Sequence, residues 1–148
     1  MNVAGAALRR NMQILAPQVL PYTEQIKYGI VLLYKVIQRS LRKTPVSPLF
    51  PPVKEYQPNW KSAMQHYAIH AGGRAVIDAI QTGLNLTDYD TEPSRHTLSR
   101  YGNTSSSSIW YEFLYLEQNG RVKTGEKLWQ VAFGSGFKCN SAVWQKIK

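Results

Sequence analysis

The sequence predicts an α/β fold that ends in strands, and three observations lead to this class. Apolar residues recur at helical spacing in several segments. A short apolar stretch at residues 63–71 is typical of a strand, and Gly72-Gly73 directly after it opens a helical pattern. Two further apolar stretches flank Gly134-Ser135-Gly136 near the carboxyl end. With 43% apolar and 11% aromatic residues in 148 positions, the chain can pack a hydrophobic core.

Two helices are expected in the amino-terminal part. Apolar residues recur at helical spacing over residues 3–15, and Pro17 and Pro21 are expected to stop this first, short amphipathic helix. A second helix is predicted from Thr23 to Lys43, with an apolar face and with cations gathered toward its end, where they suit the helix dipole.

Residues 44–58 contain five prolines, a density that excludes a helix or a central strand. The segment is therefore predicted to be an extended linker or surface crossing. It places the expected boundary between a first region at residues 1–62 and a second region at residues 63–148.

The second region is predicted to begin with a strand, a glycine turn and a helix. The strand covers residues 63–71, and the helix after Gly72-Gly73 closes near Gly83. Another short helix is expected to begin at Glu92-Pro93-Ser94, because proline is tolerated in the first turn, and to break at Gly102.

The last helix and two strands follow. Ser105–Ser108 are expected to cap a helix that ends at Asn119-Gly120. The stretches 128–133 and 137–144, joined by Gly134-Ser135-Gly136, predict an antiparallel pair of strands.

Composition limits the possible functions. Lysine and arginine number 18 against 9 acidic residues, so the net charge of +9 suits anionic partners without choosing among nucleic acid, lipid and phosphate-bearing ligands. The single cysteine, Cys139, excludes an internal disulfide, and no Cys/His cluster has zinc-ligand spacing, so no metal is expected. No signal peptide is recognised, and the apolar run 28–34 is too short to cross a bilayer. Most aromatic residues fall on apolar faces, which argues against a nucleic-acid surface.

His70 and Asn103 are the main candidates for chemistry. His70 stands at the end of the predicted strand, and Asn103 follows Gly102 on the turn before a helix. If the fold brings them together, the imidazole and the carboxamide supply two donors for one developing oxyanion, an arrangement that suits thioester chemistry. Asn103 could instead merely hold a left-handed turn, and a lone histidine beside a glycine turn is more often structural.

Other polar residues have structural interpretations beside functional ones. His66 can support His70 through hydrogen bonding or be a satisfied core histidine. Ser105–Ser108 lack an evident general base and are expected to cap a helix. Cys139 lies in an apolar stretch and is assigned to packing. The basic helix end at residues 35–43 suits CoA phosphates or an anionic membrane surface, with a solvated charge cluster as the commoner outcome.

Several motifs together resemble the carboxy-terminal part of plant very-long-chain 3-ketoacyl-CoA synthases. These are condensing enzymes of fatty acid elongation, related to chalcone synthase and β-ketoacyl synthase III. The matching stretches are residues 66–78, 92–95, 102–112 and 133–144, with a weaker match over residues 3–21.

The resemblance implies the second half of a thiolase-like αβαβα fold with an N-terminal helical lead-in. Residues 1–62 would be the end of the elongase- and chalcone-synthase-like first region, and residues 63–148 the β-ketoacyl synthase III C-terminal-like domain. It further implies a Cys–His–Asn site to which this chain contributes His70 and Asn103. His66 and the loop Gly134-Ser135-Gly136 are expected to support that site.

The activity implied is a decarboxylative Claisen condensation of malonyl-CoA with a long-chain acyl-CoA, with no cofactor beyond these substrates. A homodimer, other elongase subunits and an endoplasmic reticulum membrane are expected for the full-length family, with membrane helices outside this chain. Because the nucleophilic cysteine belongs to the other half, the chain is expected to be inactive alone.

Two departures and one alternative accompany the resemblance. Ser99 stands where these synthases often carry a histidine, and His96 stands where they usually carry a bulky apolar residue. The alternative function is a non-catalytic, truncated module that associates with an intact synthase.

Overall fold

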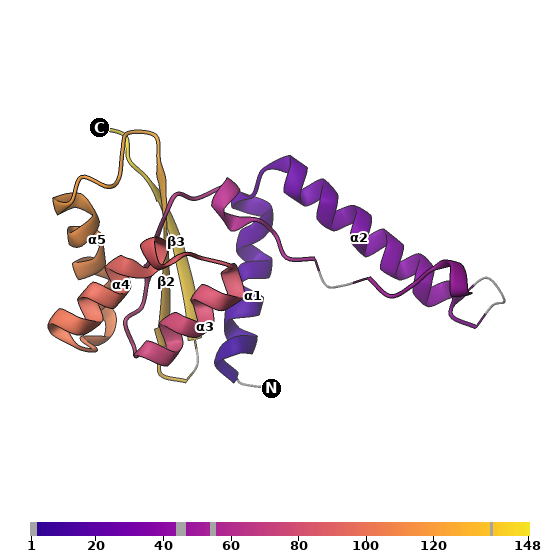
Figure 1. The fold of residues 1–148 in the computed structure, drawn as a ribbon, viewed down its shortest axis with the longest axis horizontal. Coiled ribbons are helices and arrows are strands. Elements are labelled where there is room, and N and C mark those ends of the chain that lie inside the picture. Colours follow the sequence, from indigo (N-terminus) through magenta and orange to yellow (C-terminus); the bar gives the residue numbers. More distant parts are fainter. Residues whose placement is uncertain (1–2, 44–46, 54–55, 137) are drawn as a thin grey trace.

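The computed structural model describes residues 3–43, 47–53, 56–136 and 138–148, which form an α/β body with a helical lead-in (Figure 1). Three short 3-10 turns, at Ser47–Leu49, Trp60–Ser62 and Ser105–Ser107, connect the longer elements. The helices and strands are, in chain order, α1 (Val3–Val19), α2 (Tyr22–Leu41), β1 (His66–Ile69), α3 (Arg74–Leu84), α4 (Asp88–Tyr101), α5 (Ser108–Gln118), β2 (Lys127–Gly134) and β3 (Lys138–Gln145).

The described strands form one sheet in the order β1-β2-β3. The antiparallel pairing of β2 with β3 confirms the prediction from the glycine-rich loop. β1 pairs with β2 in parallel, with Ile69 opposite Val131. A parallel pair needs a long crossover, which α3, α4 and α5 supply. The carboxyl ends of β1 and β2 therefore lie at the same edge of the sheet.

Both faces of the sheet are covered, so all four residues of β1 are buried. Tyr67 and Ile69 point into a core that also holds Trp60 and Trp129, whose rings stack 4.9 Å apart. Ala68 points to the opposite face and packs with a second set of apolar residues, Ile109, Leu116 and Leu128. The side chains of β1 thus alternate between the two faces of the sheet, although both faces are buried.

α1 lies along β3 and covers the first of these cores (Figure 1). The prediction that Pro17 stops this helix is wrong, because α1 continues to Val19 with Pro17 inside it. Pro17 falls in the last turn, where its missing N–H removes one helical bond, and the Leu20 amide still donates to the Ala16 carbonyl at 2.9 Å. The second proline, Pro21, then separates α1 from α2.

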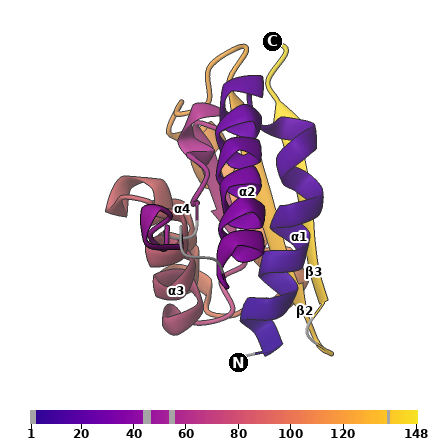
Figure 2. The same ribbon diagram turned by 90° about the vertical axis from the view of Figure 1, so that its right-hand side faces the viewer.

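α2 projects away from the sheet, and the proline-rich segment runs back along it (Figure 1; Figure 2 shows α2 in front of the body). Glu24 anchors the near end of this return, where its carboxylate accepts from the Tyr56 hydroxyl at 2.5 Å and from the Asn59 amide at 3.0 Å. Farther along, Tyr34 donates to the Pro51 carbonyl and Gln38 to the Phe50 carbonyl. Residues 44–46 and 54–55 of the predicted linker lie outside the described residues.

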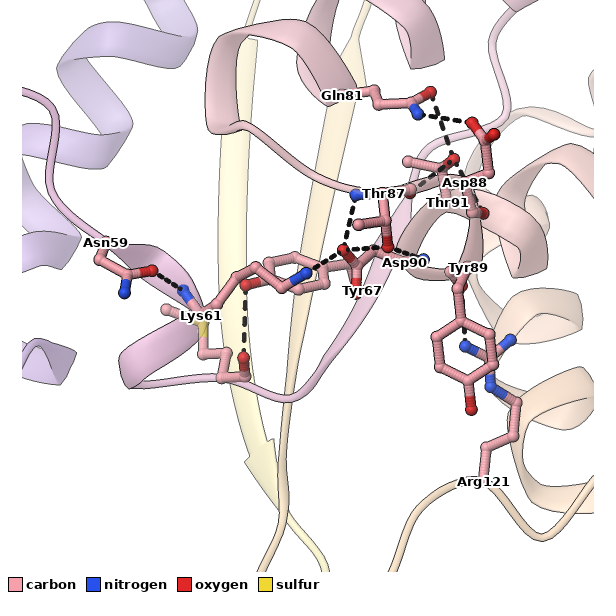
Figure 3. Close-up of polar contacts among 11 residues, drawn as sticks. Asn59, Lys61, Tyr67, Gln81, Thr87, Asp88, Tyr89, Asp90, Thr91 and Arg121 are labelled. Carbon is pink, nitrogen blue, oxygen red and sulfur yellow. Dashed lines mark hydrogen bonds and ion pairs between the residues drawn. The ribbon is translucent and has the colours of Figure 1, made fainter.

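α4 begins at Asp88, before the start that the sequence predicts at Glu92-Pro93-Ser94. Thr87 caps it at Asp88, and a reciprocal capping box joins Thr87 to Asp90 (Figure 3). Lys61 also pairs with the Asp90 carboxylate at 2.6 Å, which ties the turn before β1 to this helix end (Figure 3). Pro93 is tolerated inside α4 because the carbonyl it leaves unpaired, that of Tyr89, accepts from the Arg121 guanidinium at 2.8 Å.

Two other helix ends differ from the prediction in detail. α3 ends at Leu84, and Asn85 rather than a glycine takes the left-handed position at φ 53°. The expected serine cap of α5 is wrong, because Ser107 stands at the cap position without a side-chain cap bond. Ser105–Ser107 form a 3-10 turn instead.

Candidate functional site

His70 follows the last residue of β1 and is held there by backbone and side-chain contacts. Its amide continues the sheet by donating to the Val131 carbonyl at 3.0 Å. The chain then turns at once, since the Gly72 amide donates to the His70 carbonyl at 2.8 Å. The side chain is buried, and this burial lowers the pKa of His70 below its ordinary value. The imidazole is therefore mostly neutral at pH 7.

Gly72 is needed for the position of the imidazole ring. A Cβ atom at this position would lie 3.0 Å from Cδ2 and 3.2 Å from Nε2 of His70. Both distances are tighter than ordinary van der Waals contact, so any other residue would push against the ring edge that carries Nε2. The first glycine of the predicted glycine turn thus has a steric role beside the histidine.

Asn103 meets the same glycine from the turn between α4 and α5. Its Nδ2 donates to the Gly72 carbonyl at 3.0 Å, and its Oδ1 accepts from the Ser105 amide at 2.9 Å. The two bonds fix the orientation of the carboxamide, because one end needs a donor and the other an acceptor. The positive φ angles of this turn belong to Gly102, at 72°, and Ser105, at 56°. Asn103 itself therefore does not take the left-handed conformation.

The fold therefore places both predicted residues beside Gly72, just after the end of β1. The edge of the His70 ring lies next to the position that a side chain at Gly72 would occupy, and the Asn103 amide donates to the Gly72 carbonyl. A primary amide has two N–H groups, and the bond to Gly72 uses one of them. The second N–H of Asn103 and Nε2 of His70 are the groups that could meet a substrate oxygen.

Ser108, which the sequence assigned to a helix cap, contacts the other nitrogen of the histidine. Its Oγ lies 3.2 Å from His70 Nδ1 and donates to the Ser105 carbonyl at 2.9 Å. When the Ser108 hydroxyl donates to the Ser105 carbonyl, its oxygen can accept a hydrogen bond from Nδ1–H of His70. When the hydroxyl instead donates to Nδ1, the proton of the neutral imidazole is on Nε2. The direction in which the Ser108 hydroxyl donates is therefore linked to the tautomer of His70.

One helical turn after Ser108, α5 places Glu112 under the same strand end. Glu112 is fully buried and accepts from the Ser94 hydroxyl at 2.5 Å, and Ser94 Oγ in turn accepts from the Ile69 amide at 3.1 Å. Burial raises the pKa of Glu112 to about 8, although the hydrogen bonds from Ser94 and the Ile69 backbone oppose this shift. The carboxyl is thus neutral at pH 7 and fixes the residue before His70.

Neither Ser108 nor Glu112 was assigned a functional role from the sequence. A signal was present, since the two are polar residues four positions apart among the apolar residues of one helix. Spacing alone does not show what such a polar pair contacts.

The remaining predicted residues lie at different distances from this pair. His66 is at the opposite end of β1, about 13 Å along the strand, where its Nε2 contacts the Glu126 carboxylate at 2.8 Å. Gly134 ends β2, and Ser135 and Gly136 follow it in the turn toward β3, at the same sheet edge as His70. The supporting roles of His66 and of this loop stay predictions.

Of two described surface hollows, one lies over α4 and the other between α3 and α4, and neither is lined by His70 or Asn103. Asn103 is exposed, so the pair stands at an open surface. Cys139 packs against the first core, as predicted, and burial raises the pKa of its thiol to about 11. In the described part of the chain, no cluster of three or more histidine, cysteine or acidic residues could hold a metal ion.

Comparison with known proteins identifies the family of the chain. A family model described as 3-oxoacyl-(acyl-carrier-protein) synthase III C terminal matches residues 60–146. Among similar curated proteins, the probable 3-ketoacyl-CoA synthase 20 of Oryza sativa subsp. japonica is 49% identical over 148 residues, covering 100% of this chain and 26% of that protein. The 3-ketoacyl-CoA synthase 7 of Arabidopsis thaliana is 51% identical over 147 residues, covering 99% of this chain and 29% of its own length.

Solved structures show the same fold. The 1,3,6,8-tetrahydroxynaphthalene synthase of Streptomyces coelicolor, a bacterial type III polyketide synthase, is 27% identical with a TM-score of 0.55, covering 57% of this chain and 24% of that one. The synthase III (FabH) of Pseudomonas aeruginosa, at 17% identity and a TM-score of 0.51, covers 84% of this chain and 35% of that one.

These neighbours confirm the predicted fold class, the carboxy-terminal half of a thiolase-like fold, and the resemblance to plant 3-ketoacyl-CoA synthases. The chain spans between a quarter and a third of the length of the curated relatives named above. Since the family model covers more than half of the chain, the protein belongs to the family of 3-oxoacyl-(acyl-carrier-protein) synthase III C-terminal domains.

Proposed function

We propose that this chain supplies the histidine and the asparagine of a Cys–His–Asn condensing site in a very-long-chain 3-ketoacyl-CoA synthase. The observation that carries the proposal is the position of His70 and Asn103, which both lie beside Gly72. The relatives named 3-ketoacyl-CoA synthase support the reaction class.

The proposed reaction begins when a cysteine thiolate from the other half attacks an acyl-CoA and releases CoA. Malonyl-CoA then loses carbon dioxide, and the electron pair of the broken C–C bond moves onto the thioester oxygen as an enolate. The enolate carbon attacks the acyl thioester, which forms the new C–C bond and expels the cysteine thiolate. The product is a 3-ketoacyl-CoA two carbons longer than the acyl substrate.

His70 and Asn103 would act at the enolate. The free N–H of Asn103 and an Nε2–H of His70 would donate to the thioester oxygen as its charge develops. This role requires the imidazole proton on Nε2, and Nε2 carries it when the Ser108 hydroxyl turns from the Ser105 carbonyl and donates to Nδ1. Beside the cysteine, the imidazole would also favour the thiolate.

The proposal includes acyl-CoA and malonyl-CoA as substrates, with no further cofactor. It places the full-length protein at the endoplasmic reticulum membrane with other elongase subunits, and it keeps residues 1–62 and 63–148 as the two regions. The relatives' names support the 3-ketoacyl-CoA chemistry. The membrane, the other subunits, the lack of a further cofactor and the two regions follow from the resemblance of the motifs.

A chimeric enzyme tests the catalytic role. In the Arabidopsis 3-ketoacyl-CoA synthase 7, the matching segment is replaced by this whole chain, and 3-ketoacyl product is measured from acyl-CoA and labelled malonyl-CoA. His70→Ala and Asn103→Ala are each expected to lower the rate by about 10²–10³. Asn103→Ala should still form the acyl-enzyme, because the amide acts on malonyl-CoA.

His96→Ala is the matched control. His96 is exposed on α4, where its ring contacts Tyr115 at 4.5 Å, so its removal should leave the rate within about twofold. Equal rates for the chimera and its His70 and Asn103 variants would refute the catalytic role. An inactive chimera together with capture of an intact synthase by the isolated chain would favour the non-catalytic module instead.

A further inference from the structure

α2 carries an apolar stripe that no described part of the chain covers. Its members recur at helical spacing and are between 39% and 82% exposed. At about 100° per residue they occupy an arc of about 120° on the helix. The stripe consists of Tyr22, Ile26, Ile30, Leu33, Val36 and Ile37.

The other side of α2 is the one that packs. Glu24, Tyr34 and Gln38 lie on this side, and each bonds to the returning segment at residues 50–59. The helix is therefore held in place through its polar side while its apolar side faces outward. This is the reverse of a surface helix of a soluble domain, which buries its apolar stripe.

Positive charge gathers on α2 and just after its carboxyl end. Residues 22–43 contain five cations and a single carboxylate, and that carboxylate, Glu24, is buried and paired with Lys27. Arg39, Arg42 and Lys43 lie at the far end of the helix and are exposed. This part of the chain therefore combines apolar and cationic groups on one exposed helix.

We propose that α2 lies in the surface of an anionic lipid bilayer, with its stripe among the acyl chains and its cations at the headgroups. An amphipathic helix of 20 residues, about 30 Å long, has the dimensions of such interfacial helices. None of the helices in the described residues is long and apolar enough to span a membrane. The projection of α2 from the body leaves room for a planar surface (Figure 1).

The cations favour lipid over a protein partner as the occupant. The core of a protein interface is depleted of charge, whereas a helix at an anionic membrane places lysine and arginine beside its apolar face, where their long side chains reach the headgroups. The proposal does not depend on the condensing activity, since it concerns a different surface and requires no catalysis.

Flotation with lipid vesicles tests the proposal on the 148-residue chain. The chain should bind vesicles of phosphatidylcholine mixed with phosphatidylserine, should bind pure phosphatidylcholine more weakly, and should lose affinity as salt rises. Leu33→Gln with Ile37→Gln should weaken binding at least about tenfold. The matched control replaces two exposed isoleucines elsewhere, Ile14→Gln with Ile147→Gln, and should bind like the parent chain.

The charge contribution has its own pair of variants. Neutralising the cations at the end of α2 should weaken binding about 100-fold, and neutralising three exposed cations elsewhere should change it by less than about threefold. The first variant is Arg39→Gln, Arg42→Gln and Lys43→Gln, and the second is Arg100→Gln, Lys138→Gln and Lys148→Gln.

Three results would overturn the proposal. One is the absence of binding to anionic vesicles by the folded parent chain. Another is equal loss of binding in the stripe variant and its isoleucine control. The third is a concentration-dependent dimer that the stripe variant abolishes while vesicle binding is unchanged, which would assign the stripe to a second copy of this chain.

Discussion

Glu112 is expected to make the folded chain less stable as the pH rises. Folding raises the pKa of this carboxyl from its ordinary value of 4.5 to about 8 because the group is buried on α5. Between these two values the folded state holds one more proton than the unfolded state. The free energy of unfolding should therefore fall by about 1.4 kcal/mol per pH unit in this window.

The accumulated effect at pH 7 is about 3 kcal/mol, relative to a chain whose residue 112 does not titrate. Glu112→Gln supplies that comparison, since glutamine is of similar size and keeps an oxygen for the Ser94 hydroxyl. Its extra N–H groups cost about 1–3 kcal/mol if they are unpaired, and this cost does not depend on pH. The difference between the two pH profiles thus isolates the proton on Glu112.

Urea unfolding at pH 5, 6, 7 and 8 measures this difference. The curve for the parent chain should fall relative to that of Glu112→Gln across the series, and the fall should become shallower as the pH reaches the folded pKa of about 8. His70 has a lowered pKa and shifts stability in the opposite direction, but it is present in both proteins and cancels. Glu117→Gln is the control, because Glu117 is an exposed carboxylate on the same helix that pairs with Lys146. Parallel profiles for the parent and Glu112→Gln would refute the assignment of a buried, neutral carboxyl.

Three further predictions concern the site and the helical lead-in. Gly72→Ala should displace the imidazole of His70 and lower the condensing rate of the chimera at least about tenfold, whereas Gly73→Ala, where a Cβ meets nothing within 4 Å, should leave the rate nearly unchanged. Ser108→Ala should lower the rate and shift its pH profile, while Ser108→Thr, which keeps the hydroxyl, should retain the pH profile of the parent. Identical pH profiles for Ser108→Ala and the parent would contradict a role for the contact with Nδ1. The pKa of Glu24 is lowered to about 2 by hydrogen bonds from Lys27 and Tyr56, so stability should fall as the pH drops from about 4.5 to 2; acid unfolding of Glu24→Gln should lack this part of the transition.

The sequence predicts the elements of this fold well where local signals suffice. The glycine turns at positions 72–73 and 102 mark the places where His70 and Asn103 stand, and the structure places both residues beside Gly72. Their catalytic role stays a prediction. The hairpin of β2 and β3 follows in the same way from two glycines between apolar stretches.

The errors arise where a distant residue changes the local rule. Pro93 was expected to start a helix, but Arg121 pairs the carbonyl that the proline leaves free, so the helix begins at the Thr87 cap. Ser108 was expected to cap a helix, but it contacts His70, a residue that the strand β1 brings to it. In both cases the deciding partner is remote along the chain, so local patterns could not identify it.

The contact between α1 and β3 has a consequence for how this polypeptide acquires its structure. Asn11 accepts from the Ser141 hydroxyl at 2.5 Å and donates to the Cys139 carbonyl at 3.2 Å, while Ser141 also accepts from the Trp129 indole. α1 thus completes its hydrophobic packing only on β3, a strand that lies far along the chain from it. During synthesis, α1 must wait with an uncovered apolar side until β3 leaves the ribosome, so folding is expected to be slow and late, with chaperones most useful before that moment.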